Sequence, residues 1–322
     1  MRRAGGPGPS PTGAESLPLS RIIAVHHPIR HLERLSGLGP LCRIDLGEAP
    51  APAARVLVTG GERPLGPETM DLFPDLGLVA TMSVGTDAID LAHARARGIA
   101  VTNTPGVLTE DVADAALMLA LAARRGLVQG HDLVRSGRWA GEGPLPLMPS
   151  MTGARVGIAG MGRIGRAVAL RMQALGAEVA YHARTARPDT PLRHFPDLVA
   201  LAGWSEVLVV TVPGGAETRG LVSAEVIAAL GPEGTLVNVA RGSVVDEPAL
   251  VAALREGRLF SAGLDVFLNE PAPDPALTGL PNVVLYPHHG SGTVRARDAM
   301  ADLVFRNVAA FLDGRPLVTP LW

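Results

Sequence analysis

A glycine-rich turn between a predicted strand and a predicted helix constrains this chain more than any other feature. An apolar run at 156–159 leads into the turn, a helical pattern follows it, and a second apolar run lies at 178–181. In such a turn the first glycine allows a tight bend, the second lets a pyrophosphate approach the backbone, and the third allows close packing of helix on strand. This context predicts a dinucleotide-binding unit, and a glycine-rich turn without a ligand is the alternative. The turn consists of Gly160, Met161, Gly162, Arg163, Ile164 and Gly165.

Two series of short apolar runs, separated by helical patterns, indicate the fold class. Continuous apolar runs of this length are typical of parallel strands that are covered on both faces. With 38 glycines and 28 prolines, the chain has many turns between short elements, which suits an α/β protein better than a helical bundle. We therefore predict two Rossmann-like α/β domains with parallel sheets, one flavodoxin-like and one dinucleotide-binding. The runs lie at 22–25, 55–58, 78–82 and 99–102, and then at 155–159, 178–181, 207–211, 235–239, 262–265 and 283–286.

A long helical pattern at 111–136 and a turn-rich stretch at 137–153 separate the two series. A second helical pattern at 295–312 follows the last apolar run. We expect this last helix to return to the first domain, so that the dinucleotide-binding domain is inserted into the substrate domain. The expected divisions are a disordered tail at 1–20, a substrate (catalytic) domain at 21–120 and 293–322, and a dinucleotide-binding domain at 121–292.

The residues after the second strand of the dinucleotide-binding unit bear on the choice of cofactor. Sites for NAD place Asp or Glu there, where the carboxylate accepts hydrogen bonds from ribose hydroxyls. Here the chain continues with Ala183, Arg184 and Thr185, and no carboxylate is available. Arg184 could form paired hydrogen bonds with a 2′-phosphate, Thr185 could donate to it, and Arg187 could add charge. We therefore predict NADP as the preferred cofactor, with NAD as the alternative cofactor and a solvated basic turn as the alternative interpretation.

Three later segments carry polar side chains at the ends of predicted strands. Ligands of open α/β sheets bind outside the carboxyl ends of the strands, so Arg241, Glu270 and His288 could meet over one cleft. An arginine can pair with a substrate carboxylate and polarise the adjacent oxo group. A histidine beside a glutamate can protonate the oxygen as hydride arrives at carbon. From the residues alone, a capping or bridging ion pair, an exposed turn residue and a strand terminus remain alternatives for the three.

The motifs of the chain resemble those of the D-isomer-specific 2-hydroxyacid dehydrogenase family from about 22 to 317. The resemblance implies reduction of a small 2-oxo acid to the D-2-hydroxy acid. It implies Arg241, Glu270 and His288 as the catalytic residues, with Arg241 also binding the substrate. His289 fills a position that is usually apolar in the family and is predicted to be a bystander. The motifs are the glycine turn at 160–165, NVARGSVVDEPAL at 238–250, GLDVFLNEP at 263–271 and PHHGSGT at 287–293.

Within the family the chain most resembles the NADPH-dependent hydroxypyruvate and glyoxylate reductases. The loop after the second strand keeps the arginine and the hydroxyl of their phosphate-binding loop, as Arg184 and Thr185, but Ala183 stands where the first polar residue is expected. A phosphoglycerate dehydrogenase or another NAD-dependent D-2-hydroxyacid dehydrogenase is an alternative. A dinucleotide-sensing, corepressor-like protein without catalysis is a second alternative.

The resemblance also implies roles for residues outside these motifs. Backbone N–H groups of Val84 and Gly85 would hold the substrate carboxylate. Val212 and Pro213 would lie along the cofactor, and Asp265 would lie near the nicotinamide carboxamide.

Three further expectations concern the hinge and the assembly. The segment 103–106 would line the hinge or the cleft wall. Residues 111–150 would form the interface of a homodimer. Trp139 would lie in the cleft or the dimer loop, with a plain packing role as the alternative.

The composition argues against several other classes of protein. All 29 basic residues are arginine, which excludes Schiff-base catalysis by lysine. A net charge of −2 implies no basic surface for nucleic acid. Cys42 is the single cysteine, so we expect no disulfide, no metal site and a cytoplasmic location. The most apolar run, 112–123, is too short to span a bilayer and contains Asp114, and residues 1–18 lack the apolar core of a signal peptide.

Overall fold

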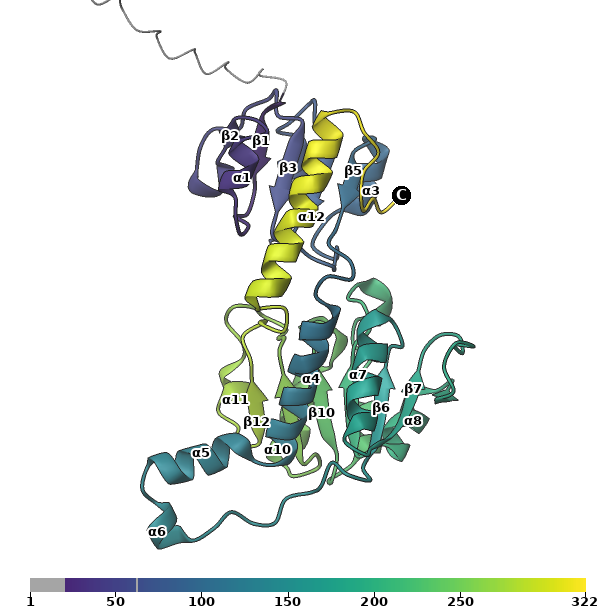
Figure 1. The fold of residues 1–322 in the computed structure, drawn as a ribbon. Coiled ribbons are helices and arrows are strands. Elements are labelled where there is room, and N and C mark those ends of the chain that lie inside the picture. The colour runs from purple at the N-terminus through teal and green to yellow at the C-terminus, as the bar shows by residue number, and fades with distance from the viewer. Residues whose placement is uncertain (1–20, 62) are drawn as a thin grey trace, which may run out of the picture. The chain divides into compact units, whose positions relative to one another are not determined.

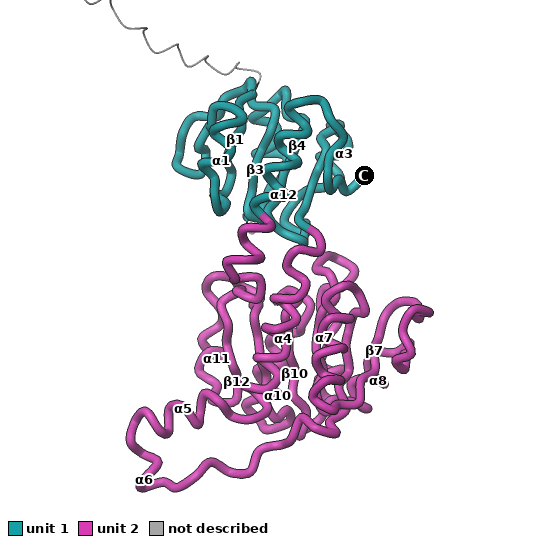
Figure 2. Tube along the Cα trace, viewed as in Figure 1, with its two compact units in different colours: residues 1–104, 301–322 teal, residues 105–300 magenta. Residues whose placement is uncertain are grey.

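The computed structural model describes residues 21–61 and 63–322, which form two compact units (Figure 2). Unit 1 runs to Thr104 and resumes at Ala301–Trp322, and unit 2 is Pro105–Met300. The expected N-terminal tail at 1–20 lies outside the described residues.

Unit 1 is built on a five-stranded parallel sheet in the order β2-β1-β3-β4-β5, the flavodoxin-like arrangement. Its three central strands are fully buried, as expected for a parallel sheet with both faces covered. Met70, Phe73 and Ile99 belong to its apolar core. The elements are β1 (Ile23–Val25), α1 (Glu33–Ser36), β2 (Leu41–Cys42), the 3-10 turn η2 (Ile44–Leu46), β3 (Val56–Thr59), α2 (Pro67–Met70), β4 (Leu78–Thr81), α3 (Leu91–Ala96) and β5 (Ala100–Thr102).

Unit 2 contains a seven-stranded parallel sheet in the order β12-β11-β10-β9-β6-β7-β8 (Figure 1). The strand order reverses between β6 and β9: β7 and β8 lie on one side of β6, and β9 to β12 lie on the other. Ligands of such sheets bind at this point, outside the carboxyl ends of the strands. The strands are β6 (Arg155–Ala159), β7 (Glu178–His182), β8 (Arg193–Phe195), β9 (Val207–Val210), β10 (Thr235–Asn238), β11 (Ser261–Leu264) and β12 (Val283–Leu285).

A helix follows each strand of unit 2 except β7, which is followed directly by β8. The helix α12 begins in unit 2 and ends in unit 1, so the predicted return helix at 295–312 is confirmed. The helices are α4 (Thr109–Arg124), α5 (Leu127–Arg135), α6 (Trp139–Glu142), α7 (Arg163–Ala174), α8 (Leu198–Trp204), α9 (Ala224–Leu230), α10 (Glu247–Arg255), α11 (Pro275–Thr278) and α12 (Val294–Leu312), with 3-10 turns η3 (Ala216–Thr218) and η4 (Gly242–Val244).

Helix α4 decides where the units divide. The sequence places the division at 121, whereas all of α4 lies in unit 2, because it packs along α7 and across β10 and β11. The helical pattern at 111–136 is not one helix: Gly126 has a left-handed backbone (φ 62°) between α4 and α5. The second division between the units falls within α12, after Met300, whereas the sequence predicts it at 293.

The predicted fold class, two α/β units with parallel sheets, is confirmed. The edge strands β2 and β8 were not predicted, since two or three residues are too few to show a periodicity and β8 begins with Arg193 and His194. Among the described residues, no helix is both long enough and apolar enough to cross a membrane.

Candidate active site

The glycine turn joins β6 to α7 and has the geometry that a pyrophosphate needs. Gly160 has φ 104°, and a Cβ there would lie 2.9 Å from the backbone nitrogen of Val212. A Cβ at Gly165 would lie 2.0 Å from the carbonyl oxygen of Gly160, so the helix packs directly on the turn. A Cβ at Gly162 would meet nothing within 4 Å. The first and third glycines are therefore required by packing, while the second faces open space at the positive end of a 12-residue helix.

The other residues of the turn differ in exposure. The side chain of Met161 is buried, that of Ile164 is half-buried and that of Arg163 is exposed. Thr211, after β9, donates from its backbone N–H to the Ala159 carbonyl oxygen at 2.8 Å and from its hydroxyl to the Gly160 carbonyl oxygen at 2.7 Å. The end of β9 is thus tied to the glycine turn, which places Val212 against it, with Pro213 exposed in the next position.

The loop after β7 carries the residues predicted to choose the cofactor. Ala183 is buried, whereas Arg184, Thr185 and Arg187 are exposed. The hydroxyl of Tyr181 accepts the backbone N–H of Arg187 at 2.6 Å, which holds the loop close to the strand.

The residues 181–187 at the end of β7 contain no carboxylate, but a carboxylate from another segment lies beside Arg184. The guanidinium of Arg184 donates to Glu217 Oε2 at 3.0 Å, and the two side chains are 88% and 83% exposed. Glu217 lies in η3, after β9, and is separated from Arg184 by 33 positions, so the sequence around the second strand cannot reveal it. The carboxylate beside Arg184 therefore comes from the segment that follows a different strand, β9.

The predicted histidine and glutamate form a direct pair. His288 follows β12 and its Nδ1 lies 2.6 Å from Glu270 Oε2. The second oxygen of Glu270 accepts the backbone N–H of Phe267 at 2.8 Å. The side chains of His288 and Glu270 are 36% and 32% exposed, so the pair is partly shielded but open to a ligand. Since Nδ1 is engaged, Nε2 is the nitrogen that can exchange a proton with a substrate.

The charges of this pair follow from its geometry. The hydrogen bond to Glu270, assisted by its charge, raises the pKa of His288, although burial and the charge of Arg241 act in the opposite direction. Burial acts to raise the pKa of Glu270, but the hydrogen bond and charge of His288, with Arg241 nearby, lower that pKa below its ordinary value. The pair therefore favours an imidazolium beside a carboxylate.

Arg241 follows β10 on a turn that is braced from both sides. Asn238 accepts the backbone N–H of Ala240 at 3.0 Å and donates to the carbonyl oxygen of Arg241 at 2.9 Å. A Cβ at Gly242 would lie 1.9 Å from the backbone carbonyl carbon of Phe267. The turn that carries Arg241 therefore packs directly on the turn that carries Glu270, and the structure brings the three predicted catalytic residues together within unit 2.

Asp265 supports the loop that carries the histidine. Its buried carboxylate accepts the backbone N–H groups of His289 at 2.7 Å and Gly290 at 2.9 Å, and its carbonyl oxygen accepts the N–H of His288 at 2.7 Å. Burial raises the pKa of Asp265, and the two N–H donors oppose this. Both carboxylate oxygens thus orient the loop, and the implied contact of Asp265 with a nicotinamide stays a prediction. The ring of His289 lies edge-on to Tyr286 with centroids 5.7 Å apart.

Glu247 is a further supporting residue, which is not among the predicted site residues. Its carboxylate is buried at the start of α10 and accepts the backbone N–H of Leu268 at 2.9 Å. It therefore supports the turn that carries Glu270 through a second contact, separate from that of His288. Its place in the NVARGSVVDE motif, six positions after Arg241, is the only signal in the sequence that could have indicated it.

In unit 1 the predicted carboxylate-binding loop follows β4. The carbonyl oxygen of Ser83 accepts the N–H of Thr104 at 2.9 Å, and that of Val84 accepts the side-chain amide of Asn103 at 2.9 Å. These bonds turn the carbonyl groups of the loop toward the start of the 103–106 segment. The roles of Val84 and Gly85 stay predictions.

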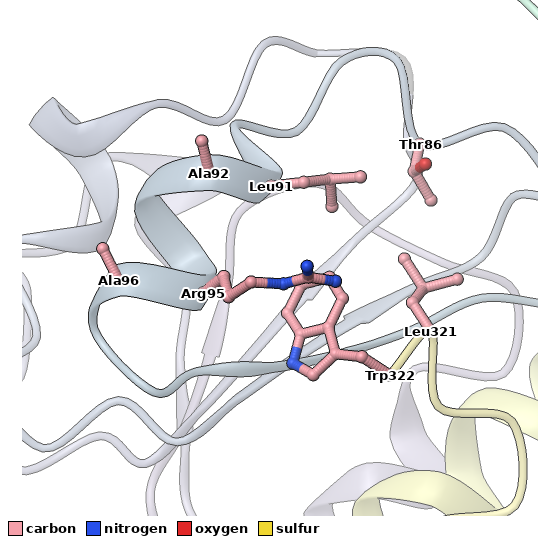
Figure 3. Close-up of a pocket in the computed structure, with 7 residues that line it drawn as sticks. All are labelled: Thr86, Leu91, Ala92, Arg95, Ala96, Leu321 and Trp322. Atoms are coloured by element: carbon pink, nitrogen blue, oxygen red, sulfur yellow. The ribbon is translucent and has the colours of Figure 1, made fainter.

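A separate hollow of about 750 Å³ lies on unit 1 (Figure 3). The guanidinium of Arg95 stacks on the ring of Trp322 at 4.6 Å to the centroid and closes one side of it. None of the predicted site residues lines this hollow. Its lining is Thr86, Leu91, Ala92, Arg95, Ala96, Leu321 and Trp322.

The chain matches one family model and is similar to several known proteins. Residues 117–290 match the family model described as D-isomer specific 2-hydroxyacid dehydrogenase, NAD binding domain. The chain is 44% identical over 295 residues to a 2-ketogluconate reductase of Gluconobacter oxydans, covering 92% of this chain and 91% of the relative. It is 49% identical over 249 residues to glyoxylate/hydroxypyruvate reductase A of Arabidopsis thaliana, covering 77% and 79%.

A solved structure is similar over nearly the whole fold. It is the NADPH-dependent glyoxylate/hydroxypyruvate reductase of Sinorhizobium meliloti in complex with NADP and malonate. The TM-score is 0.87 and the sequence identity 44%, and the match covers 93% of this chain and 96% of that one.

Proposed function

Since the chain belongs to the D-isomer-specific 2-hydroxyacid dehydrogenase family, we propose that it reduces a small 2-oxo acid of the hydroxypyruvate or glyoxylate type to the D-2-hydroxy acid, with NADPH preferred and NADH as the alternative cofactor. The observation that carries this proposal is the His288–Glu270 pair at 2.6 Å, beside the turn of Arg241. Neither a phosphoglycerate dehydrogenase nor a corepressor-like sensor is favoured by the relatives, whose names are those of reductases.

The chemistry of reduction assigns one task to each catalytic side chain. A reduced nicotinamide dinucleotide bound at the glycine turn supplies the hydride. His288 gives its Nε2 proton to the carbonyl oxygen as the carbon is reduced, and then regains a proton from solvent. Glu270 keeps the imidazole oriented and charged before the transfer. Arg241 pairs with the substrate carboxylate and polarises the oxo group, and the backbone N–H groups of Val84 and Gly85 are assigned to the same carboxylate.

The cofactor residues divide along the dinucleotide. Gly162 leaves space for the pyrophosphate at the start of α7, beside the backbone of Met161, Arg163 and Ile164. Arg184 and Thr185 are assigned to the 2′-phosphate because both are exposed at the end of β7. The residues assigned to the remainder of the cofactor are Gly160, Gly165, Val212, Pro213 and Asp265.

The proposed function is tested by following nicotinamide absorbance with NADPH and with NADH against hydroxypyruvate, glyoxylate and phenylpyruvate. We expect faster oxidation of NADPH than of NADH, and higher kcat/KM with hydroxypyruvate or glyoxylate than with phenylpyruvate. A folded protein that binds the dinucleotide but oxidises neither cofactor with any of the three acids would contradict the proposal.

Glu270→Gln should shift the pH dependence of reduction. The reaction needs protonated His288, and the paired carboxylate raises the pKa of that imidazole, so activity is present at low pH and falls as pH rises through the raised pKa. Removing the charge lowers the pKa of His288. The alkaline fall of kcat/KM should therefore move to lower pH, with a loss of about tenfold or more at pH 8 and a smaller loss at pH 6. A uniform loss at every pH would show that Glu270 acts only by holding the ring in place.

We also propose a homodimer that forms through residues 111–150, in the cytoplasm and without a nucleic-acid or membrane partner. The segment 127–150, which contains α5 and α6, stands apart from the sheet of unit 2 (Figure 1). It exposes apolar side chains, including Leu127 (61%), Trp139 (55%) and Leu147 (102%). Exposed apolar side chains gathered on one segment are typical of an interface.

The dimer predicts a definite change in mass. Light scattering after size-exclusion chromatography should give about twice the mass of one chain, and the double variant Leu127→Arg, Leu147→Arg should give a single-chain mass because a charge opposes burial in an apolar interface. Leu170→Arg, at an exposed leucine of α7, is the matched control and should stay dimeric. A wild-type protein of single-chain mass would contradict the proposed assembly.

A further inference from the structure

A carboxylate lies within hydrogen-bond distance of the arginine that is assigned to the 2′-phosphate. Arg184 Nη1 and Glu217 Oε2 are 3.0 Å apart, on segments that follow two different strands of unit 2. With side chains 88% and 83% exposed, the ion pair itself contributes little to stability. The carboxylate of Glu217 nevertheless acts on a phosphate that binds nearby, because a charge acts on its surroundings whether or not it is paired.

The backbone position of Glu217 is set by its own turn rather than by the ion pair. The hydroxyl of Thr218 donates to the carbonyl oxygen of Pro213 at 2.7 Å, and the N–H of Thr218 donates to that of Gly215 at 3.2 Å. Gly215 has φ 140°, a backbone conformation that residues other than glycine rarely adopt. The turn is therefore closed on the segment after β9, and Glu217 is held beside the loop that follows β7.

The two forms of the cofactor differ only at the 2′ position of the adenosine ribose, and Glu217 acts oppositely on them. A 2′-phosphate is a strong acceptor that carries between one and two negative charges, so the carboxylate repels it while Arg184 attracts it. A 2′-hydroxyl can donate a hydrogen bond to a carboxylate, as the acidic residue of NAD sites shows. The same pair therefore offers a partner to either cofactor.

We propose that Glu217 is a specificity-determining residue that moderates the preference for NADPH over NADH. This inference rests on the proposed function, in which Arg184 receives the 2′-phosphate. Arg184 raises the affinity for the phosphorylated ribose of NADPH. Glu217 lowers that affinity by repulsion, and it raises the affinity for the unphosphorylated ribose of NADH by accepting a hydrogen bond. The chain should consequently discriminate less strongly than a site with the arginine alone.

The test compares two probes that carry only the adenosine end of each cofactor. Adenosine 2′,5′-bisphosphate and 5′-AMP are titrated by calorimetry into the wild type, Glu217→Gln and the control Glu178→Gln. Glu178 is exposed at the amino end of β7, whereas Arg184 follows its carboxyl end, so the control removes the same charge at a distance. One unit charge acting on another at about 4 Å in water changes an affinity by about fivefold.

We expect Glu217→Gln to bind the bisphosphate about fivefold more tightly, with no gain for 5′-AMP. The gain should shrink in 1 M NaCl, since salt screens exposed charges. Glu178→Gln should match the wild type with both probes. In steady-state kinetics, the ratio of kcat/KM for NADPH to that for NADH should rise in Glu217→Gln by a similar factor.

The outcomes separate this inference from the function on which it rests. Unchanged or weaker binding of the bisphosphate to Glu217→Gln would overturn the inference, and weaker binding would mean that Glu217 orients Arg184 for the phosphate. If the wild type binds the bisphosphate no more tightly than 5′-AMP, and Arg184→Gln changes neither affinity, the NADPH preference itself is wrong. If Arg184→Gln loses affinity for the bisphosphate alone, the preference stands and the Glu217 result decides the inference.

Discussion

His288→Asn should lower kcat for reduction of the 2-oxo acid by roughly a thousandfold, within the range that general acid catalysis contributes. The dissociation constant for NADPH should stay within about twofold of wild type, because no cofactor contact is assigned to this side chain. Asn is the appropriate replacement, since His288 has φ 48° and Asn adopts the left-handed region more readily than other residues of similar size. Single-turnover absorbance measures the chemical step, and quenching of protein fluorescence measures NADPH binding.

The adjacent histidine offers a matched control for this experiment. His289→Asn changes the same type of side chain in the same loop, and the N–H that Asp265 accepts belongs to the backbone and is kept. We expect it to retain most of the wild-type kcat. Parallel losses of kcat and NADPH affinity in His288→Asn would mean that the histidine holds the loop together and is not the acid.

Arg241→Gln should lower kcat/KM by roughly a thousandfold, because it removes both the partner of the substrate carboxylate and the charge that polarises the oxo group. Arg241→Lys should recover only part of the loss, since an ammonium keeps the charge but not the paired donors. Steady-state kinetics with hydroxypyruvate measures both variants. Arg258→Gln, at an exposed arginine of unit 2 that pairs with Glu256, is the control and should behave as wild type.

The pH profile distinguishes Arg241 from Glu270. The charge of Arg241 lowers the pKa of His288, so its removal should raise that pKa and move the alkaline fall of kcat/KM to higher pH. Glu270→Gln should move the same alkaline fall of kcat/KM to lower pH. If both variants shift the alkaline fall of kcat/KM in the same direction, Arg241 does not lie close enough to the His288 imidazole to lower its pKa. The assigned arrangement would then be wrong.

Much of this protein could be predicted from local sequence, because the features concerned depend on neighbouring residues. The glycine turn was recognisable since packing within one strand–turn–helix unit requires Gly160 and Gly165, and Gly162 leaves open space at the start of the helix. The parallel sheets were recognisable from continuous apolar runs, which need no knowledge of their partners. Arg241, Glu270 and His288 were identified as candidates because each follows a predicted strand, and carboxyl ends of parallel strands share one edge.

Other features depend on contacts between distant positions, and only the tertiary structure decided them. The carboxylate beside Arg184 comes from Glu217, 33 positions away, because β9 and β7 flank β6 in the sheet and bring their following loops together. The support of the catalytic turns by Glu247 and Asp265 likewise arises where separate strand ends meet. The chain by itself determined the fold class and the chemical groups available, since these follow from backbone sterics, burial and residue type. The sheet order determined which of those groups act on one another, since electrostatic and hydrogen-bonding effects depend on distance in space rather than on separation along the chain.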